Sequence, residues 1–212
     1  MLLDVLPRVS FFIVLHRIDQ DFAERIKEGG CLFCGGPLHD AHYRRKPRGG
    51  PADLPDEMSI RLGLCCGRDG CRRRALPPSV MYFGRRVYWG AVVLVLTAIL
   101  QGRSRGHTYS ELQRRFGVNR LTLKRWQAWF AGELRRTRCW QSICGALPLD
   151  ALGDEQPRAV LENLLLREED AGRGVTLCLS LLSGGPLSVA QARIARDRAV
   201  HAEDGELYLA ET

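Results

Sequence analysis

Residues 108–130 read TYSELQRRFGVNRLTLKRWQAWF, and this stretch predicts two short amphipathic helices joined by a tight turn. Leu112 and Phe116 are one helical turn apart, so they share a face of the first helix. Gly117 breaks the run, because glycine supplies the backbone freedom that a sharp corner needs. Asn119 is a good N-cap, so we expect the second helix to begin at the following residue.

The second helix of this stretch separates apolar from polar residues. Leu123, Trp126 and Phe130 recur at helical spacing and are expected to face inward. The outer side carries residue types that read base edges or bind phosphate, namely Arg120, Thr122, Lys124, Arg125 and Gln127. The stretch resembles a helix-turn-helix, whose second helix enters the DNA major groove. The DNA contacts that it predicts are Asn119, Arg120, Thr122, Lys124 and Arg125.

Charge favours this interpretation over an ordinary helical domain with a solvated charged face. Residues 101–138 contain ten Arg or Lys against two acids, Glu111 and Glu133. The whole chain has a formal net charge of +7 and a pI near 9.2, which suits a polyanionic partner. The excess is carried almost wholly by arginine, whose planar fork of donors binds phosphate and guanine.

The cysteines indicate a metal site. Cys31 and Cys34 are separated by two residues and are followed by two glycines, which is typical of a zinc knuckle. A second set begins about thirty residues later, as Cys65-Cys66-Gly-Arg-Asp-Gly-Cys71. Two such knuckles make a closed tetrahedral site of four thiolates, and closed sites are structural. The ligands we predict for a structural Zn²⁺ are Cys31, Cys34, Cys66 and Cys71.

Some ligand choices remain open at this point. Cys65 is the alternate to Cys66, which we prefer because it opens the glycine-bearing turn. His39 is an alternate to one of the cysteines, and His42 competes with it. The spacing of Cys31, Cys34 and His39 begins like a retroviral zinc knuckle, but Arg44 stands where that motif needs its last cysteine.

Two basic segments flank the predicted metal site and are candidates for phosphate contacts. They consist of Arg44, Arg45, Lys46 and Arg48 in one loop, and Arg72, Arg73 and Arg74 directly after the last cysteine. A rigid zinc core lowers the entropy cost of holding flexible arginines near a nucleic-acid backbone. Solvated basic loops are the alternative interpretation.

The remaining pattern predicts a mainly α fold. We expect an N-terminal helix (1–30), a zinc-binding basic module (31–80), a three-helix helix-turn-helix domain (81–138) and a helical C-terminal region (139–212). Within these, we expect helices at 10–28, 88–101, 158–169 and 188–200, a linker at 101–106, and an apolar patch at 177–182 that is a helix or a strand. Cys139, Cys144 and Cys178 are expected to be small buried hydrophobic residues.

Nothing in the sequence predicts export or a membrane span. The longest apolar run, residues 87–100, is too short to cross a bilayer comfortably. The N-terminal residues include Asp4, Pro7 and Arg8 and lack the pattern of a signal peptide. We therefore expect a cytoplasmic, nucleoid-associated protein in which clustered cysteines bind metal rather than form disulfides.

The combination of motifs resembles a family of short, transposon-encoded bacterial proteins. The resemblance covers roughly residues 10–140 and rests on CLFCGGPLH (31–39), KPRGGP (46–51), CCGRDGCRRRALPPSV (65–80), GRRVY (84–88) and GVNRLTLKRW (117–126). Members are described as transposases or helix-turn-helix proteins, which implies association with mobile DNA.

These observations predict a sequence-specific DNA-binding protein that acts as a non-catalytic accessory or end-binding subunit in transposition. Its expected partners are double-stranded DNA and a separate transposase or recombinase, and a homodimer is compatible with the sequence. A transcriptional regulator is the alternative within DNA binding. The rivals from other classes are a His-Asn-His-like nuclease and a protein-interaction adaptor. His39-Asp40 resembles the start of the nuclease motif, but its later Asn and His are missing. We expect no enzyme activity, because no strand-rich segment could carry the carboxylates of strand transfer.

Overall fold

The computed structural model describes residues 2–84, 86–101, 108–137, 140–141, 144, 170–186, 188, 190 and 193. The fold is mainly α with two small antiparallel sheets, in agreement with the predicted class. The helices are α1 (Val9–Gly29), α2 (Gly90–Gln101), α3 (Tyr109–Phe116), α4 (Arg120–Ala131) and α8 (Ala171–Ser183), with 3-10 turns η1 (Leu2–Val5), η2 (Asp56–Ser59) and η3 (Glu133–Arg136). The strands are β1 (Leu38–Asp40), β2 (Tyr43–Arg44), β3 (Ile60–Arg61), β4 (Leu64–Cys66) and β5 (Arg74–Ala75).

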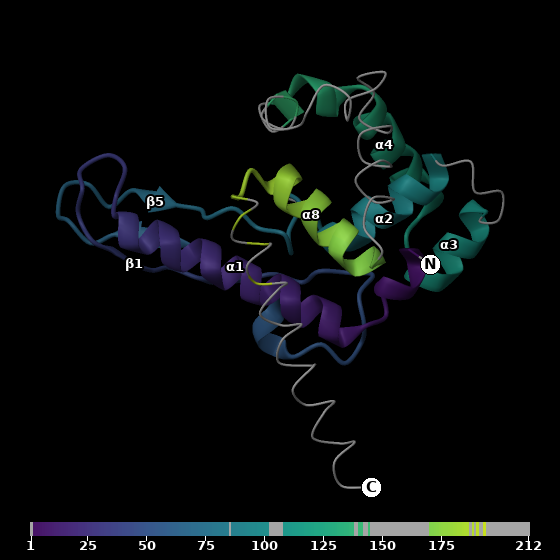
Figure 1. Ribbon diagram of the computed structural model, residues 1–212, viewed down its shortest axis with the longest axis horizontal. Coiled ribbons are helices and arrows are strands. Elements are labelled where there is room, and N and C mark those ends of the chain that lie inside the picture. Colours follow the sequence, from purple (N-terminus) through teal and green to yellow (C-terminus); the bar gives the residue numbers. More distant parts are fainter. Residues whose placement is uncertain are drawn as a thin grey trace, which may run out of the picture.

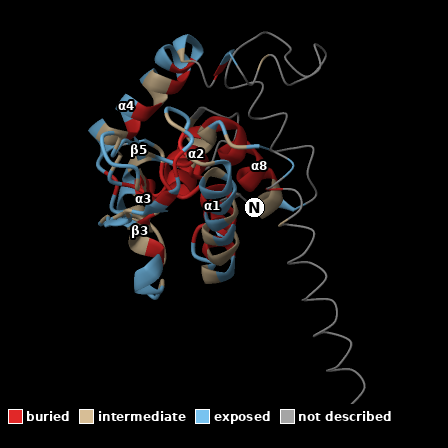
Figure 2. Cartoon of the chain, turned by 90° about the vertical axis from the view of Figure 1, so that its left-hand side faces the viewer, coloured by how far each residue is buried: buried red, intermediate tan, exposed pale blue. Residues whose placement is uncertain are grey.

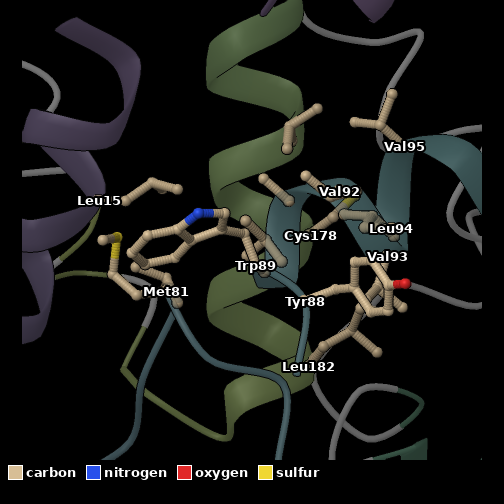
Figure 3. Packing of buried hydrophobic residues seen from close by; sticks show 14 of the residues in the cluster. Leu15, Met81, Tyr88, Trp89, Val92, Val93, Leu94, Val95, Cys178 and Leu182 are labelled. Atoms are coloured by element: carbon tan, nitrogen blue, oxygen red, sulfur yellow. The ribbon is translucent and has the colours of Figure 1, made fainter. Parts of the chain in front are cut away.

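The centre of the molecule is α2, which is buried from Ala91 to Thr97. It packs against α4, α8 and η1 (Figure 1). Figure 2 shows the buried residues gathered around α2 and α8, with exposed residues outside them. The helix begins at Gly90 rather than at Tyr88, because the backbones of Tyr88 and Trp89 pair with residues of preceding loops. Trp89 then projects into the core toward Leu15 and Met81 (Figure 3).

The apolar patch at residues 177–182 forms part of α8, so its helical interpretation is correct. Asp170 caps the helix by accepting a hydrogen bond from Arg173 N–H at 2.8 Å. Gly184 ends it in the left-handed conformation (φ 73°). Cys178 is fully buried, as expected, and Cys144 packs partly buried against the same core. Cys139 and the predicted helix 158–169 lie outside the described residues.

Helix α1 connects this core to the cysteine-rich segment. Its first half buries Phe12, Leu15 and Ile18 in the main core, whereas Ile26 near its end packs on the cysteines. In Figure 1 the end of α1, β1 and β5 lie at the opposite end of the molecule from α3. We call residues 31–75 the cysteine module, and the first half of α1 with η1, α2, α3, α4, η3 and α8 the helical body.

A buried carboxylate fastens α1 to the loop before α2. Asp19 is 3% exposed and accepts hydrogen bonds from the Val80 N–H at 2.7 Å and from the Ser79 hydroxyl. Burial raises the pKa of Asp19 to about 7 despite these two donors and the nearby charge of Arg61. The loop that leaves the cysteine module is therefore held to the helical body by a polar contact inside the core.

The turn between α3 and α4 follows from local sequence. Thr108 caps α3 by accepting from Glu111 N–H at 3.2 Å, and Gly117 adopts the left-handed conformation (φ 63°) that ends it. Asn119 caps α4 by accepting from Leu121 N–H at 2.7 Å. The apolar residues that face inward are Leu112, Val118, Leu123, Trp126 and Phe130. Both helices therefore pack onto the body by one face only.

The structure describes only part of the expected linker at 101–106 and of the expected helix at 188–200. Residues 102–107 of the expected linker, and the region 188–200 apart from three helical residues, lie outside the described part of the chain. Among the helices that the structure describes, none has both the length and the apolar character of a membrane span.

Candidate metal centre and basic surfaces

Four cysteine thiols converge beyond the end of α1. The sulfur atoms of Cys31, Cys34, Cys66 and Cys71 all lie within 4.8 Å of one another. The Sγ atoms of Cys31 and Cys71 are 3.8 Å apart, and those of Cys34 and Cys66 are 3.5 Å apart. Four sulfurs at about 2.3 Å from one tetrahedral zinc ion would be about 3.8 Å apart. The structure therefore brings together the four cysteines that the sequence predicts, and they could hold a metal ion.

The first pair of thiols comes from a tight turn directly after α1. Gly35 N–H donates to the Cys31 carbonyl at 2.7 Å, and Cys31 N–H donates to the Gly36 carbonyl at 2.9 Å. A Cβ atom added at Gly36 would lie 3.3 Å from the sulfurs of both Cys34 and Cys66. Glycine at this position therefore lets the backbone approach the thiols closely.

The second pair comes from the connection between β4 and β5. Cys71 N–H donates to the Arg68 carbonyl at 3.1 Å, and Cys66 N–H donates to the Arg73 carbonyl at 2.9 Å. Strand β1 pairs antiparallel with β4 and sets Leu38 opposite Cys66. The sheet thereby brings the two turns together from positions far apart in the sequence.

Backbone N–H groups surround the sulfurs. Each of three thiols accepts an N–H from the residue two positions later: Phe33 to Cys31, Arg68 to Cys66 and Arg73 to Cys71. The Phe33 N–H is the main cause that lowers the pKa of the Cys31 thiol to about 7. At Cys66 the Arg68 N–H also lowers the pKa, but burial and the neighbouring thiols together raise it to about 12. Such N–H groups stabilise thiolates, the form that binds metal.

The alternate ligands lie elsewhere. Cys65 and Cys66 are adjacent in β4, so their side chains point to opposite faces and only one can join the cluster. The Cys65 thiol donates instead to a backbone carbonyl 3.4 Å away. His39 is exposed on β1, and Nδ1 of His42 lies 3.1 Å from the carbonyl oxygen of Gly63. Neither histidine belongs to the group of candidate ligands found among the described residues.

The first basic segment does not present one uniform surface. Arg44 forms an exposed ion pair with Asp56 at 3.5 Å. Lys46 and Arg48 are exposed, and within the described part of the chain their side chains have no polar partner. The guanidinium of Arg45 is turned inward and donates to two backbone carbonyls at 3.0 and 2.7 Å. Arg45 therefore contacts other parts of the chain, whereas Lys46 and Arg48 are exposed to solvent.

The second basic segment surrounds the outer end of the cysteine module. Arg72 has a left-handed backbone (φ 45°) and pairs with Asp69 at 3.2 Å. The guanidinium of Arg73 lies 4.1 Å from the ring centroid of Phe33. Arg74 is exposed on β5. These arginines are fixed at their backbones by the same turn that carries Cys71.

Three residues at this end were missed by sequence reasoning. Leu32 is 92% exposed and Phe33 is 65% exposed, although both are large and apolar. Arg68 donates to the Cys34 carbonyl at 2.7 Å and so joins the two cysteine turns. The signal was present, because residues between the ligands of a Cys-x-x-Cys turn lie at its tip. We call Leu32, Phe33, Arg72, Arg73 and Arg74 the module tip.

The outer face of α4 carries the predicted DNA contacts. Arg120, Lys124 and Arg125 are exposed, and Thr122 is half-buried. Asn119 is exposed, but its side-chain oxygen is engaged in capping α4. The Arg120 guanidinium lies 5.3 Å from the ring centroid of a tyrosine on α3. Three cations therefore project from the first two turns of this helix into solvent.

Gln127, expected on the outer face, faces the body instead. It accepts a hydrogen bond from the Tyr109 hydroxyl and donates to the Leu100 carbonyl at 3.3 Å. The side chain thus joins α4 to α3 and to the end of α2. Its inward direction removes it from the outer face of α4.

Comparison of the chain with protein-family models, with curated proteins and with solved structures found no match.

Proposed function

We propose that the cysteine module holds a structural Zn²⁺ ion and that the chain uses it to bind double-stranded DNA. A site of four thiolates suits zinc, and an S₄ set without an open position leaves no room for a catalytic water. Iron is the competing metal for an S₄ site. Four thiolates around a divalent ion carry a net negative charge, which Arg68, Arg72 and Arg73 partly offset.

The main support for DNA binding is the set of exposed cations on the outer face of α4. Its inner residues are buried in the body, whereas Arg120, Lys124 and Arg125 are exposed at its N-terminal end. A helix that presents cations and polar groups from its first turns has the geometry of a major-groove reader. We assign base contacts to these three residues and to Thr122. Asn119 supports them by capping the helix.

The module tip provides a second contact in this proposal. Arg72, Arg73 and Arg74 would bind phosphates, which adds affinity without adding sequence information. In Figure 1 the module and α4 lie in opposite halves of the molecule along its longest axis, so one duplex would run along the molecule to meet both surfaces. Lys46 and Arg48 are exposed cations of the same module and would add to the phosphate contacts.

The proposed biological role is a non-catalytic, end-binding or accessory subunit for a mobile element. It rests on the resemblance of the cysteine and GVNRLTLKRW segments to transposon-encoded proteins. A separate transposase or recombinase would then supply the strand-transfer chemistry. A transcriptional regulator would use the same α4 surface.

A protein-interaction adaptor is the second candidate. The exposed side chains of Leu32 and Phe33 favour it, because solvent-exposed apolar residues often mark contact sites. The two candidates differ in what the tip should bind. An adaptor would need Leu32 and Phe33, whereas a phosphate contact would need the arginines.

The test is selection of bound sequences from a random duplex library with the zinc-loaded protein, followed by binding measurements on the selected site. We expect Arg125→Ala and Lys124→Ala each to reduce discrimination between selected and scrambled duplex by about 1–3 kcal/mol. Combined alanine substitution of Arg72, Arg73 and Arg74 should weaken binding to both duplexes equally and flatten its salt dependence.

The matched control is Arg25→Ala, which removes an exposed arginine from α1. It should change neither discrimination nor the salt dependence. Failure of the library to enrich any sequence, with equal loss of weak binding in all these variants, would reject the α4 assignment. Cutting of supercoiled DNA that depends on a divalent metal and disappears in His39→Ala would favour the nuclease instead.

A further inference from the structure

A cleft of about 650 Å³ lies where the cysteine module meets the helical body. Its walls come from the paired strands β2 and β3, from residues 76–79, 82–84 and 86, from the end of α4 with η3, and from the C-terminal end of α8. Because these segments are far apart in the sequence, the cleft is a product of the tertiary fold. The volume is within the range of about 300–1,000 Å³ that is typical of sites for organic ligands, and much larger than a bare phosphate needs.

Three arginines line this cleft: Arg45, Arg61 and Arg86. Among the described lining residues there is no aspartate or glutamate. Arg61 is only 8% exposed, and the other two are half-buried. Burial lowers the pKa of Arg61 and of Arg86, so the surroundings disfavour these charges in the absence of a counter-charge.

The Asp19 carboxylate only partly compensates this charge. Asp19 attracts Arg61, but its oxygens accept hydrogen bonds from Ser79 and Val80 and it does not line the cleft. Arg45 lies close enough to Arg61 to lower the pKa of that residue further. The cleft therefore has a net positive wall that an anion would stabilise.

Backbone carbonyls hold the arginines in place. Arg45 donates to the Gly84 and Arg86 carbonyls at 3.0 and 2.7 Å, and Arg61 donates to the Leu62 carbonyl at 2.8 Å and to the Pro77 carbonyl. Among the described residues, Arg86 donates one long hydrogen bond, to the Phe83 carbonyl at 3.4 Å. A guanidinium has five N–H donors, so each retains donors for a ligand. Neutral carbonyls fix the geometry without cancelling the charge.

Aromatic rings form the rest of the lining. The ring of Tyr43 projects from β2 and is 39% exposed, and it stands opposite Arg61 in the β2–β3 pair. Tyr82, Phe83 and Trp129 complete this wall. The Arg86 guanidinium already lies over the Trp129 ring, 4.4 Å from its centroid. Such rings favour a planar, partly apolar group next to the anion.

We propose that this cleft binds a nucleotide, with its phosphate at Arg45, Arg61 and Arg86 and its base against Tyr43. The nucleotide is either free or the terminal unit of an unpaired DNA strand, because both offer the same phosphate and base. The proposal does not depend on α4 binding DNA. It assigns Arg45, first considered as a phosphate contact of a solvent-exposed loop, to a pocket that selects one nucleotide.

The test is isothermal titration of the full-length, zinc-loaded protein with deoxyadenosine monophosphate, deoxyadenosine and inorganic phosphate. We expect the monophosphate to bind at least tenfold more tightly than either fragment. Arg86→Gln should reduce its affinity tenfold or more. Tyr43→Ala should reduce the affinity for the monophosphate severalfold and leave that for phosphate unchanged.

Folding is checked by the thermal midpoint and zinc content of each variant. Tyr43 is partly exposed, so Tyr43→Ala keeps the test valid even if Arg86→Gln does not fold. Arg74→Gln is the matched control, since Arg74 is exposed and outside the cleft, and it should leave the affinity unchanged. No binding of the monophosphate at millimolar concentration, or binding that is the same in both variants, would overturn the proposal.

A short single-stranded oligonucleotide with a 5′-phosphate distinguishes the two sources. Binding tighter than that of the monophosphate, and lost in Arg86→Gln, would assign the cleft to a strand end. Equal or weaker binding would assign it to a free nucleotide. Both results keep the nucleotide site, and duplex binding through α4 is measured separately.

Discussion

The helical body and the cysteine module are stabilised by different interactions. The body has a continuous core that includes the fully buried Phe12, Leu15, Leu94 and Leu96, whereas the separate core of the module has only four buried members. Two of those four are the cysteines Cys31 and Cys66. Apolar burial alone rarely stabilises so small a unit, and natural proteins add metals or disulfides in such cases. From this difference we expect metal binding and folding to be coupled in the module.

The largest expected effect is the loss of the metal. Cys66→Ser removes a buried ligand, and structural zinc contributes on the order of 10–16 kcal/mol in small zinc-binding peptides. We expect this variant to lose bound zinc and to become protease-sensitive within residues 31–75, while α2 and α8 stay protected. Metal content and limited proteolysis with mass spectrometry measure both.

The neighbouring cysteine is the matched control. Cys65 lies on the opposite face of β4, and its thiol points away from the cluster. Cys65→Ser should therefore retain a full equivalent of zinc. Loss of zinc in this variant as well would contradict the ligand assignment.

The second effect lies in the body. Phe12 is fully buried and packs edge-on against Trp89, with ring centroids 5.5 Å apart. Phe12→Ala should lower the free energy of unfolding by about 3–5 kcal/mol, because it leaves a cavity in the core. Urea unfolding monitored by tryptophan fluorescence measures this loss. The zinc content should stay at one equivalent, and its release would indicate that the two regions do not fold independently.

The third effect concerns the contact between α1 and the loop before α2. The folded pKa of Asp19 is raised to about 7, above the value near 3.9 of an unfolded chain. The folded state therefore binds an extra proton at Asp19 between these values, so the contribution of Asp19 to stability is greatest below about pH 4 and falls as the pH rises to 7. We expect a loss on the order of 3 kcal/mol across this window.

Asp19→Asn isolates this effect from other groups that titrate, including the thiols. The amide can still accept from Val80 and donate to Ser79, but it carries no charge. Urea unfolding at a series of pH values should give a flatter profile for this variant. Profiles of equal slope in both proteins would show that Asp19 is not the cause.

The smallest effect is at the corner between α3 and α4. Gly117 has φ 63°, and a Cβ atom there would meet no other atom within 4 Å. Gly117→Ala should therefore cost only about 1–2 kcal/mol of backbone strain. The thermal midpoint of the body should fall slightly, with zinc content unchanged. A much larger loss would mean that the corner is packed against other parts of the chain.

Local patterns made much of this molecule predictable. The two-residue spacing of Cys31 and Cys34 is itself the geometry of a ligand-bearing turn, so the cluster followed from sequence. The capping role of Asn119 likewise depends only on neighbouring backbone atoms. Alternation along a strand distinguishes Cys66 from Cys65, once the strand is known.

Features that depend on contacts between residues far apart in the sequence could not be predicted. The sequence left the patch in α8 open between helix and strand, because a short apolar run that is buried on all sides shows no periodicity. Gln127 turns inward because Tyr109 and Leu100 offer it partners from other helices. Arg45 turns into the cleft because two carbonyls after β5 accept its hydrogen bonds.

The central claim is that a bound metal, and not apolar burial, holds the cysteine module and its arginine-bearing tip. Hydrogen–deuterium exchange of the zinc-loaded protein, before and after removal of the metal with a chelator, tests it most directly. We predict that residues 31–75 lose protection while α2 and α8 keep theirs. Unchanged protection of the module after complete removal of the metal would contradict the account.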